Sequence, residues 1–302
     1  MYYFLINAKS GSGKGGKAWK QVERALQHKG IRYHAAFSEN EEQAARFIHT
    51  MKQDDIRDIQ GFIVIGGDGT VQSVVQELAY TDIPFSIIPA GSGNDFARGL
   101  KLPLKPLEAL EALLTAASKR IDLLKVGGRL CVTVVGIGID GTVAYEVNRS
   151  SLKKWFNTLR LGSLAYVFSL LKVLVRYKTQ TVTLQLDEGG AVTARDVWLI
   201  AAANFKSYGG GMNICPQASA SDGLMDLCVV SGVGRMELLR VFPQVFRGTH
   251  VSHPAVSMYR ASRLDVTSAS PMLAHGDGEL FGETPLAVEI AKQAVTVLYR
   301  NE

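Results

Sequence analysis

The sequence predicts an α/β domain with a parallel sheet, followed by a mainly antiparallel β-sandwich domain. Up to about residue 125, short apolar strands alternate with amphipathic helices, and glycine-rich loops directly follow several of the strands. Beyond that point, short strands are joined by Gly or Asp turns, which is typical of antiparallel sheets. The predicted domains are residues 1–125 and 126–291, and the last apolar run, within 292–302, is expected to return to the first domain.

The composition is that of an ordinary globular protein. Of the 302 residues, 47% are hydrophobic and 20% are charged. The net charge of +5 suits an anionic small molecule or a membrane surface, and it is too diffuse to predict a nucleic-acid partner. The three cysteines lack metal-ligand spacing and are expected to be reduced thiols. Neither a signal peptide nor an apolar run of about 18 residues is evident, so a cytoplasmic protein is expected.

The first two strand–helix units show how the predicted domain begins. A strand at residues 3–6 runs into a glycine- and lysine-rich loop at residues 7–16, which lacks the ending of a P-loop and is either a phosphate contact or a flexible connection. The next strand, residues 31–37, is followed by Ser38 and Glu41, which have the spacing of a capping box.

The third unit carries the most informative stretch. Phe62 to Ile65 read as a buried strand, residues 66–70 as a glycine turn, and residues 71–78 as a helix with apolar residues on one face. The exposed N–H groups of such a junction favour a phosphate. Asp68 within the turn either belongs to a site with Mg²⁺ or caps the helix, and the glycines alone do not distinguish these interpretations.

The fourth unit adds another glycine-rich loop. A strand at residues 85–88 ends in the loop 89–98, Pro106 begins a helix at its first position, and a further strand begins at Ile121. Ligands of parallel sheets bind at the carboxyl ends of the strands. We therefore expect the three glycine-rich loops to meet at one sheet edge.

The second part of the chain reads as antiparallel strands interrupted by a basic segment. The predicted strands cover residues 132–135, 181–186, 197–203, 225–230, 263–266 and 286–290. Residues 152–178 mix Lys and Arg with aromatic side chains, and they either lie in a membrane interface or form helices packed on the sandwich.

Four motifs in order resemble the bacterial diacylglycerol kinase and related lipid kinase family, whose catalytic domain is shared with sphingosine kinases. They are Gly66-Gly67-Asp68-Gly69-Thr70, the run Pro89 to Arg98, Gly209-Gly210-Gly211 with Ser221 to Asp226, and Gly276-Asp277-Gly278-Glu279. The first motif alone would also fit NAD kinases or phosphofructokinases. The resemblance implies a Rossmann-like nucleotide domain, a β-sandwich domain and an ATP cleft between them.

The resemblance also implies the residues that bind ATP and the metal. The implied ATP contacts are Ser38, Gly66, Gly67, Asp68, Gly69, Thr70, Val71, Gln72 and Ser92. Asp68, Asp95 and Asp122 match acidic residues that organise water and Mg²⁺ near the phosphates. Asp222 and the backbone carbonyls of Met225 and Leu227 match a structural Mg²⁺ site, although a plain hairpin turn is an alternative.

Asp277 matches the catalytic base, a carboxylate that orients the attacking hydroxyl and accepts its proton. The expected activity is therefore transfer of the γ-phosphate of ATP, with Mg²⁺, to a lipid hydroxyl, diacylglycerol first. Gln72 and Ser73 depart from the family, which usually has Asn and a carboxylate there. A soluble NAD- or sugar-type kinase and a non-catalytic nucleotide-binding regulator remain the alternatives. A lipid substrate at the inner face of the membrane, peripheral attachment and a possible homodimer are expected.

Overall fold

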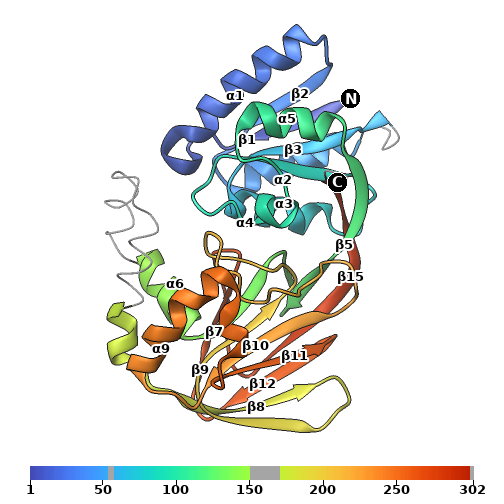
Figure 1. Ribbon diagram of the computed structural model, residues 1–302. Coiled ribbons are helices and arrows are strands. Elements are labelled where there is room, and N and C mark those ends of the chain that lie inside the picture. Colours follow the sequence, from blue (N-terminus) through green and yellow to red (C-terminus); the bar gives the residue numbers. More distant parts are fainter. Residues whose placement is uncertain (54–57, 150–170, 300–302) are drawn as a thin grey trace. The chain divides into compact units, whose positions relative to one another are not determined.

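The computed structural model describes residues 1–53, 58–149 and 171–299, and its contacts divide the chain into two compact units (Figure 1). Unit 1 comprises Met1–Ile121 and Gln293–Glu302, and unit 2 comprises Asp122–Lys292. The first unit therefore ends at residue 121 where the sequence predicted 125, and the second ends at 292 where it predicted 291.

Unit 1 is built on a parallel sheet, as predicted. The strands β1 (Tyr2–Ile6), β2 (Tyr33–Phe37), β3 (Gly61–Gly66) and β4 (Phe85–Pro89) pair in the order β4-β3-β1-β2. The end of β15 (Leu286–Tyr299) adds to this sheet, because Val297 pairs in parallel with Phe85. The helices are α1 (Ser10–His28), α2 (Glu41–Met51), α3 (Asp68–Leu78), α4 (Asp95–Gly99) and α5 (Pro106–Leu114).

The apolar helix face predicted for residues 71–78 is buried, which confirms its helical periodicity (Val71, Val74, Val75 and Leu78). The helices α1 and α2 bury apolar residues in the same way (Ala18, Val22, Leu26, Ala44, Ile48 and Met51). Stacking of Phe85 on Phe96, with ring centroids 5.2 Å apart, joins β4 to α4. The glycine-rich loops directly follow the carboxyl ends of β1, β3 and β4.

The predicted capping box at Ser38 is wrong. The N-cap of α2 is Asn40, whose side chain accepts a hydrogen bond from the Gln43 amide at 2.9 Å. The Ser38 hydroxyl instead donates to the Asn40 carbonyl at 2.8 Å. The Ser38 amide still donates to the Ile6 carbonyl of β1 at 2.9 Å, so the chain turns after Ser38, and Asn40 stands at the helix start.

Unit 2 is mainly antiparallel, as predicted. Its strands are β5 (Ala117–Val126, which begins in unit 1), β6 (Arg129–Cys131), β7 (Val134–Gly138), β8 (Gln180–Leu186), β9 (Ala191–Ala203), β10 (Met225–Ser231), β11 (Val256–Ala261), β12 (Arg263–Ser268), β13 (Leu273–Gly276), β14 (Glu279–Glu283) and the first part of β15. They pair in the order β14-β13-β7-β9-β8-β12-β15, with β10 between β9 and β11. Two apolar clusters fill the unit.

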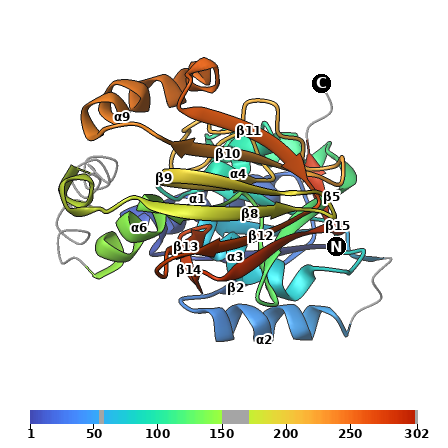
Figure 2. The same ribbon diagram turned by 90° about the horizontal axis from the view of Figure 1, so that it is seen from below.

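Several elements of unit 2 were not predicted. They are the strands β6 and β11, the helices α6 (Ile139–Arg149) and α9 (Arg235–Val241), the 3-10 helices η2 (Phe242–Arg247) and η3 (Thr249–Ser252), and the hairpin β13–β14. Figure 2 shows α6 and α9 at the same end of the unit 2 sheet. Most of the predicted basic segment, residues 150–170, lies outside the described residues, and residues 171–176 are helical. The three cysteines are free and buried, in agreement with reduced thiols.

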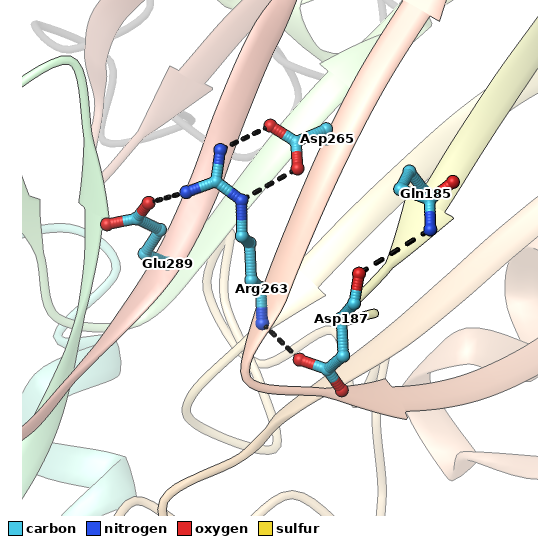
Figure 3. Close-up of polar contacts among 5 residues, drawn as sticks. All are labelled: Gln185, Asp187, Arg263, Asp265 and Glu289. Atoms are coloured by element: carbon cyan, nitrogen blue, oxygen red, sulfur yellow. Dashed lines mark hydrogen bonds and ion pairs between the residues drawn. The ribbon is translucent and has the colours of Figure 1, made fainter. Parts of the chain in front are cut away.

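A polar corner fixes the outer strands of unit 2 (Figure 3). Asp187 follows β8 in the left-handed conformation, with φ of 47°, and its carboxylate accepts from the amides of Ser262 and Arg263, both at 2.9 Å. These bonds and the Ser262 hydroxyl lower the pKa of Asp187. The Arg263 guanidinium binds both oxygens of Asp265, at 2.7 Å each, and also Glu289. The corner thus ties β8, β12 and β15 together.

Candidate functional site

The three glycine-rich loops of unit 1 meet at the carboxyl edge of its sheet. The Asn7 amide donates to the Ile65 carbonyl at 2.9 Å, and the Ala90 amide donates to Gly66 at 2.7 Å. The Asn7 side chain bridges two loops, since it donates to the Thr70 hydroxyl at 3.2 Å and accepts from the Ser10 amide at 3.1 Å. The expectation that these loops share one edge is confirmed.

Close backbone approach explains the glycines of the central turn. A Cβ atom on Gly91 would lie 2.6 Å from the Cα of Gly67, and one on Gly66 would lie 2.8 Å from the Thr70 hydroxyl oxygen. Neither Gly66 nor Gly67 has a positive φ, so the reason is space and not an unusual dihedral. The Cα of Gly69, by contrast, faces open space. Backbone is therefore exposed to whatever ligand approaches Gly69.

Asp68 makes a contact that neither sequence interpretation foresaw. Its Oδ1 accepts a hydrogen bond from the Phe96 amide at 3.1 Å, in the first turn of α4. Asp68 therefore links the glycine turn to the neighbouring loop, while Gly67 is the N-cap of α3. Asp95, buried at the start of α4, stands beside this bond. The two acidic residues predicted from unit 1 are thus brought to one place.

The remaining predicted nucleotide residues of unit 1 lie along the same edge but differ in exposure. The Ser38 amide donates to the Ile6 carbonyl at 2.9 Å, which places Ser38 at the end of β2, and Ser92 is exposed in the third loop. The side chains of Val71 and Gln72 are buried in α3. Val71 can therefore offer a ligand only its backbone.

Asp277 is held in the turn between β13 and β14. It has a φ of 50°, and its carboxylate accepts from the Val132 amide at 2.6 Å, from the Thr133 amide at 3.1 Å and from the Thr133 hydroxyl. Burial raises the pKa of Asp277, although the hydrogen bonds from Thr133 and Val132 oppose that rise. The side chain is thus fixed in position by donors on the strand connection before β7.

A buried polar cluster includes His275, two residues before Asp277 in the chain. Asp140, at the start of α6, accepts from the Tyr208 hydroxyl at 2.6 Å and lies 2.8 Å from Nε2 of His275. Burial alone would lower the pKa of His275, but the carboxylate of Asp140, together with that of Asp277, raises it above its usual value. A Cβ on Gly136 would lie 2.2 Å from the Asp140 carboxylate, so the cluster requires glycine there.

An apolar cavity of about 70 Å³ opens beside this cluster within unit 2. Asp140 and Tyr208 stand in its wall, and His250 and Trp198 contribute the other polar groups. The rest of the lining consists of Ile139, Leu174, Leu199, Met212, Ile214, Val230, Leu238, Leu239, Val241, Phe242 and Val245. At this volume the cavity suits only a short stretch of a hydrocarbon chain, with polar groups at its wall.

Of the residues predicted for the structural Mg²⁺ site, Asp222 lies in a bend, whereas Met225 and Leu227 lie in a strand. Asp222 accepts from the Leu224 amide at 3.1 Å and forms an ion pair with Arg260. Met225 and Leu227 lie in β10, which is flanked by β9 and β11. Among the described residues, no group of three or more His, Cys, Asp or Glu side chains is arranged to hold a metal. The Arg260 guanidinium neutralises Asp222 in this structure, and the site of one carboxylate and two backbone carbonyls stays a prediction.

Asp122 has a structural role that the sequence did not show. It is almost fully buried, and its Oδ2 accepts from the Gly223 amide at 2.7 Å. Its own amide donates to the Ala220 carbonyl at 2.7 Å. Asp122 thus holds the third motif against β5 in unit 2.

Three residues that organise the two sites were missed. Asn94 adopts the left-handed conformation and bonds with Gly91 through both side-chain groups, at 2.8 and 3.2 Å. Its place after glycines is a signal that could have been used, because Asn tolerates this conformation. Asn7 and Thr133 act through partners 63 and 144 residues away, and no local pattern marks them.

Two family models together cover most of the chain. Residues 1–126 match the diacylglycerol kinase catalytic domain, and residues 133–299 match the YegS C-terminal NAD kinase beta sandwich-like domain. A diacylglycerol kinase of Mycobacterium tuberculosis (strain ATCC 25618 / H37Rv) is 33% identical over 300 residues, which cover 97% of this chain and 93% of that protein. The chain belongs to the diacylglycerol kinase family of lipid kinases.

Other comparisons agree with this family assignment. A diacylglycerol kinase of Bacillus subtilis (strain 168) is 30% identical over 240 residues, covering 78% of this chain and 77% of the relative. A crystal structure from Bacillus anthracis str. Sterne, named a diacylglycerol kinase, superposes with a TM-score of 0.72 at 19% identity, covering 99% and 96% of the two chains. A further one from that organism reaches 0.80 at 21% identity, covering 99% and 95%. At these identities the solved structures show the common fold.

In residues 1–53, 58–149 and 171–299, no helix combines the length and the apolar character that crossing a bilayer requires.

Proposed function

We propose that this family member transfers the γ-phosphate of ATP, with Mg²⁺, to the hydroxyl of a membrane lipid, and that diacylglycerol is its first candidate acceptor. One observation carries the lipid part of the proposal. A fixed carboxylate, Asp277, lies in the same unit as an apolar cavity, and His275, two residues before Asp277, contacts Asp140 in the cavity wall. A soluble sugar or nucleotide is polar, so an enzyme acting on it would not need an apolar cavity in this unit.

The edge of the unit 1 sheet supports nucleotide binding. The first turn of α3 begins there, and the backbone N–H groups of a helix N-terminus favour phosphate oxygens. Gly69 faces open space, so a phosphate can approach the backbone closely. Asp68 retains acceptor capacity beyond its bond to Phe96, and with Asp95 it fits an ion carried by the nucleotide. Bound Mg²⁺ would neutralise phosphate charge, and Asp68 is the residue proposed to hold it.

Asp277 is the proposed base for the acceptor hydroxyl. Phosphoryl transfer depends mainly on positioning and on charge neutralisation, so a base must be held in place more than it must be strong. The amides of Val132 and Thr133 and the Thr133 hydroxyl fix the Asp277 carboxylate. In its deprotonated form it can orient the lipid hydroxyl and accept its proton as the new O–P bond forms.

The deciding experiment measures transfer of labelled γ-phosphate from ATP to lipids in mixed micelles. The panel contains diacylglycerol, other lipid alcohols, soluble alcohols and NAD, each with and without Mg²⁺. Label in phosphatidic acid is the expected result. Label only in a soluble acceptor would contradict the lipid assignment, and label in another lipid would replace diacylglycerol while keeping the reaction class.

A further inference from the structure

The exposed apolar side chains of unit 2 gather on two helical elements, the helix at residues 171–176 and the consecutive helices α9 and η2. Of its large hydrophobic residues that are exposed among those described, Leu171 and Val175 lie on the helix at residues 171–176, Met236 on α9 and Phe246 on η2, while Met258 lies elsewhere. Val175 is 72% exposed and Met236 is 69% exposed. Side chains of this kind in such a group commonly mark an interaction surface.

The two elements form one surface, which we call the basic helical face. Arg235, at the start of α9, donates from Nε to the Leu174 carbonyl at 3.0 Å and from its guanidinium to the Tyr177 carbonyl at 2.9 Å. It thereby caps the helix at residues 171–176. Figures 1 and 2 show this helix and α9 at the same end of the unit 2 sheet.

Basic side chains surround the apolar ones on this face. Those exposed are Lys172, Arg176, Lys178, Arg240 and Arg247. Two acids stand among them: Glu146 is paired with Lys172 at 2.8 Å, and Glu237 lies 3.5 Å from His253. On the helix at residues 171–176, the spacing i, i+4 puts Leu171 with Val175 and Lys172 with Arg176 in neighbouring rows. The face is therefore cationic and apolar at once.

The inner sides of the same elements line the apolar cavity. Leu174 faces it from the helix at residues 171–176, Leu238 and Leu239 from α9, and Phe242 and Val245 from η2. The outer sides of these helices thus suit anionic headgroups. Their inner sides suit part of a hydrocarbon chain.

We propose that the basic helical face docks on the surface of an anionic lipid bilayer. Its apolar side chains enter the interface, and its arginines and lysines lie among the headgroups. The connection between the docking face and the cavity rests on the proposed function, in which the lipid acceptor comes from the bilayer. Docking itself needs no phosphate transfer, so it can be tested separately.

The experiment measures partitioning of the full-length protein onto sedimented vesicles at low salt. Vesicles of phosphatidylcholine with phosphatidylglycerol are compared with vesicles of phosphatidylcholine alone. Arg240→Gln with Arg247→Gln should weaken binding to the anionic vesicles about fivefold for each arginine. Val175→Ser with Met236→Ser should weaken binding to the anionic vesicles by about tenfold or more, because it removes apolar side chains without changing charge.

Matched controls sit in unit 1. Lys20→Gln with Arg24→Gln removes two exposed charges from α1, and Leu107→Ser removes an exposed apolar side chain from α5. Both should bind like the unaltered protein, and the melting temperature of every variant is measured to exclude unfolding. If the α1 pair loses binding and the α9–η2 pair does not, or if all variants bind equally, the proposal is wrong.

Phosphate transfer to an acceptor in detergent micelles distinguishes this failure from failure of the proposed function. The docking variants should keep this micellar activity while losing activity on vesicles. Transfer that is intact in micelles, together with unchanged vesicle binding in the variants, would overturn the docking face and leave the kinase assignment standing. Vesicle binding that depends on the face, with no transfer to any acceptor, would overturn only the kinase assignment.

Discussion

The two candidate sites of this protein are built on opposite principles. The edge of the unit 1 sheet is made of backbone: three loops from the ends of neighbouring strands, with glycines where chains approach each other. The site around Asp277 is made of side chains from distant segments, joined by Thr133, His275 and Asp140. A backbone site can be recognised from its local pattern, whereas a side-chain site depends on partners that the fold alone brings near.

The two sites also differ in what holds their residues in position. Close contact between glycine backbones positions the loops of unit 1, so added volume is what disturbs them. Hydrogen bonds position Asp277 in unit 2, so the loss of a donor or of the carboxylate is what disturbs it. Four substitutions test this difference, and they are given in order of decreasing effect.

The largest effect is expected for Asp277→Asn. The side chain keeps its size and tolerates the left-handed backbone, but it cannot accept a proton, so transfer should fall by about 10²–10⁴. Binding of ATP, measured by calorimetry, should change little. Asp196→Asn is the matched control, because Asp196 also has a positive φ in unit 2, at 52°. Activity of Asp277→Asn near that of the control would remove Asp277 from the mechanism.

Gly91→Ala should destabilise unit 1 by about 1–3 kcal/mol, since its Cβ would lie 2.6 Å from the Gly67 Cα and must push two backbones apart. Gly69→Ala adds the same methyl group in open space at the start of α3 and should leave the free energy of unfolding unchanged or slightly higher. Denaturant unfolding of both variants provides the measurement. Equal losses of stability would refute the close-approach explanation.

Thr133→Val should shift the pH dependence of the reaction. The Thr133 hydroxyl donates to Asp277 and lowers its pKa against the effect of burial, so its removal raises that pKa further. Because the base acts when deprotonated, activity should be lost at a higher pH on the acid side of the profile of kcat/KM. Thr133→Ser keeps the donor and serves as the control. Identical acid limbs for the Val and Ser variants would count against this role.

The smallest effect is expected for Asp187→Ala in the polar corner of unit 2. Loss of its hydrogen bonds to Ser262 and Arg263 should cost at most about 1 kcal/mol, because the side chain is exposed. The pKa of Asp187 is lowered in the folded protein, so its contribution exists at neutral pH and disappears as the pH falls through that lowered pKa. The stability difference between the two proteins should therefore shrink in acid, where only the cost of Ala in the left-handed conformation remains. Asp187→Asn, which retains an acceptor, should lie between them.

Much of the fold followed from local patterns. Helical periodicity identified the buried face of α3, because burial against the sheet dictates that pattern. The alternation of apolar strands with helices identified the parallel sheet of unit 1. The capping box failed because two side chains near a helix start, Ser38 and Asn40, both have the right chemistry. Only the path of the chain after β2 decided between them.

The sequence by itself determined the two domains, the family motifs and the glycine-rich loops, since each of these depends on neighbours within about ten residues. The tertiary structure alone decided what the acidic residues do. Asp68 binds the amide of Phe96, Asp122 holds Gly223, and Asp277 is fixed by Thr133, 144 positions earlier in the chain. Carboxylates bind whatever donor the fold brings within about 3 Å, and no local pattern in a sequence contains that information.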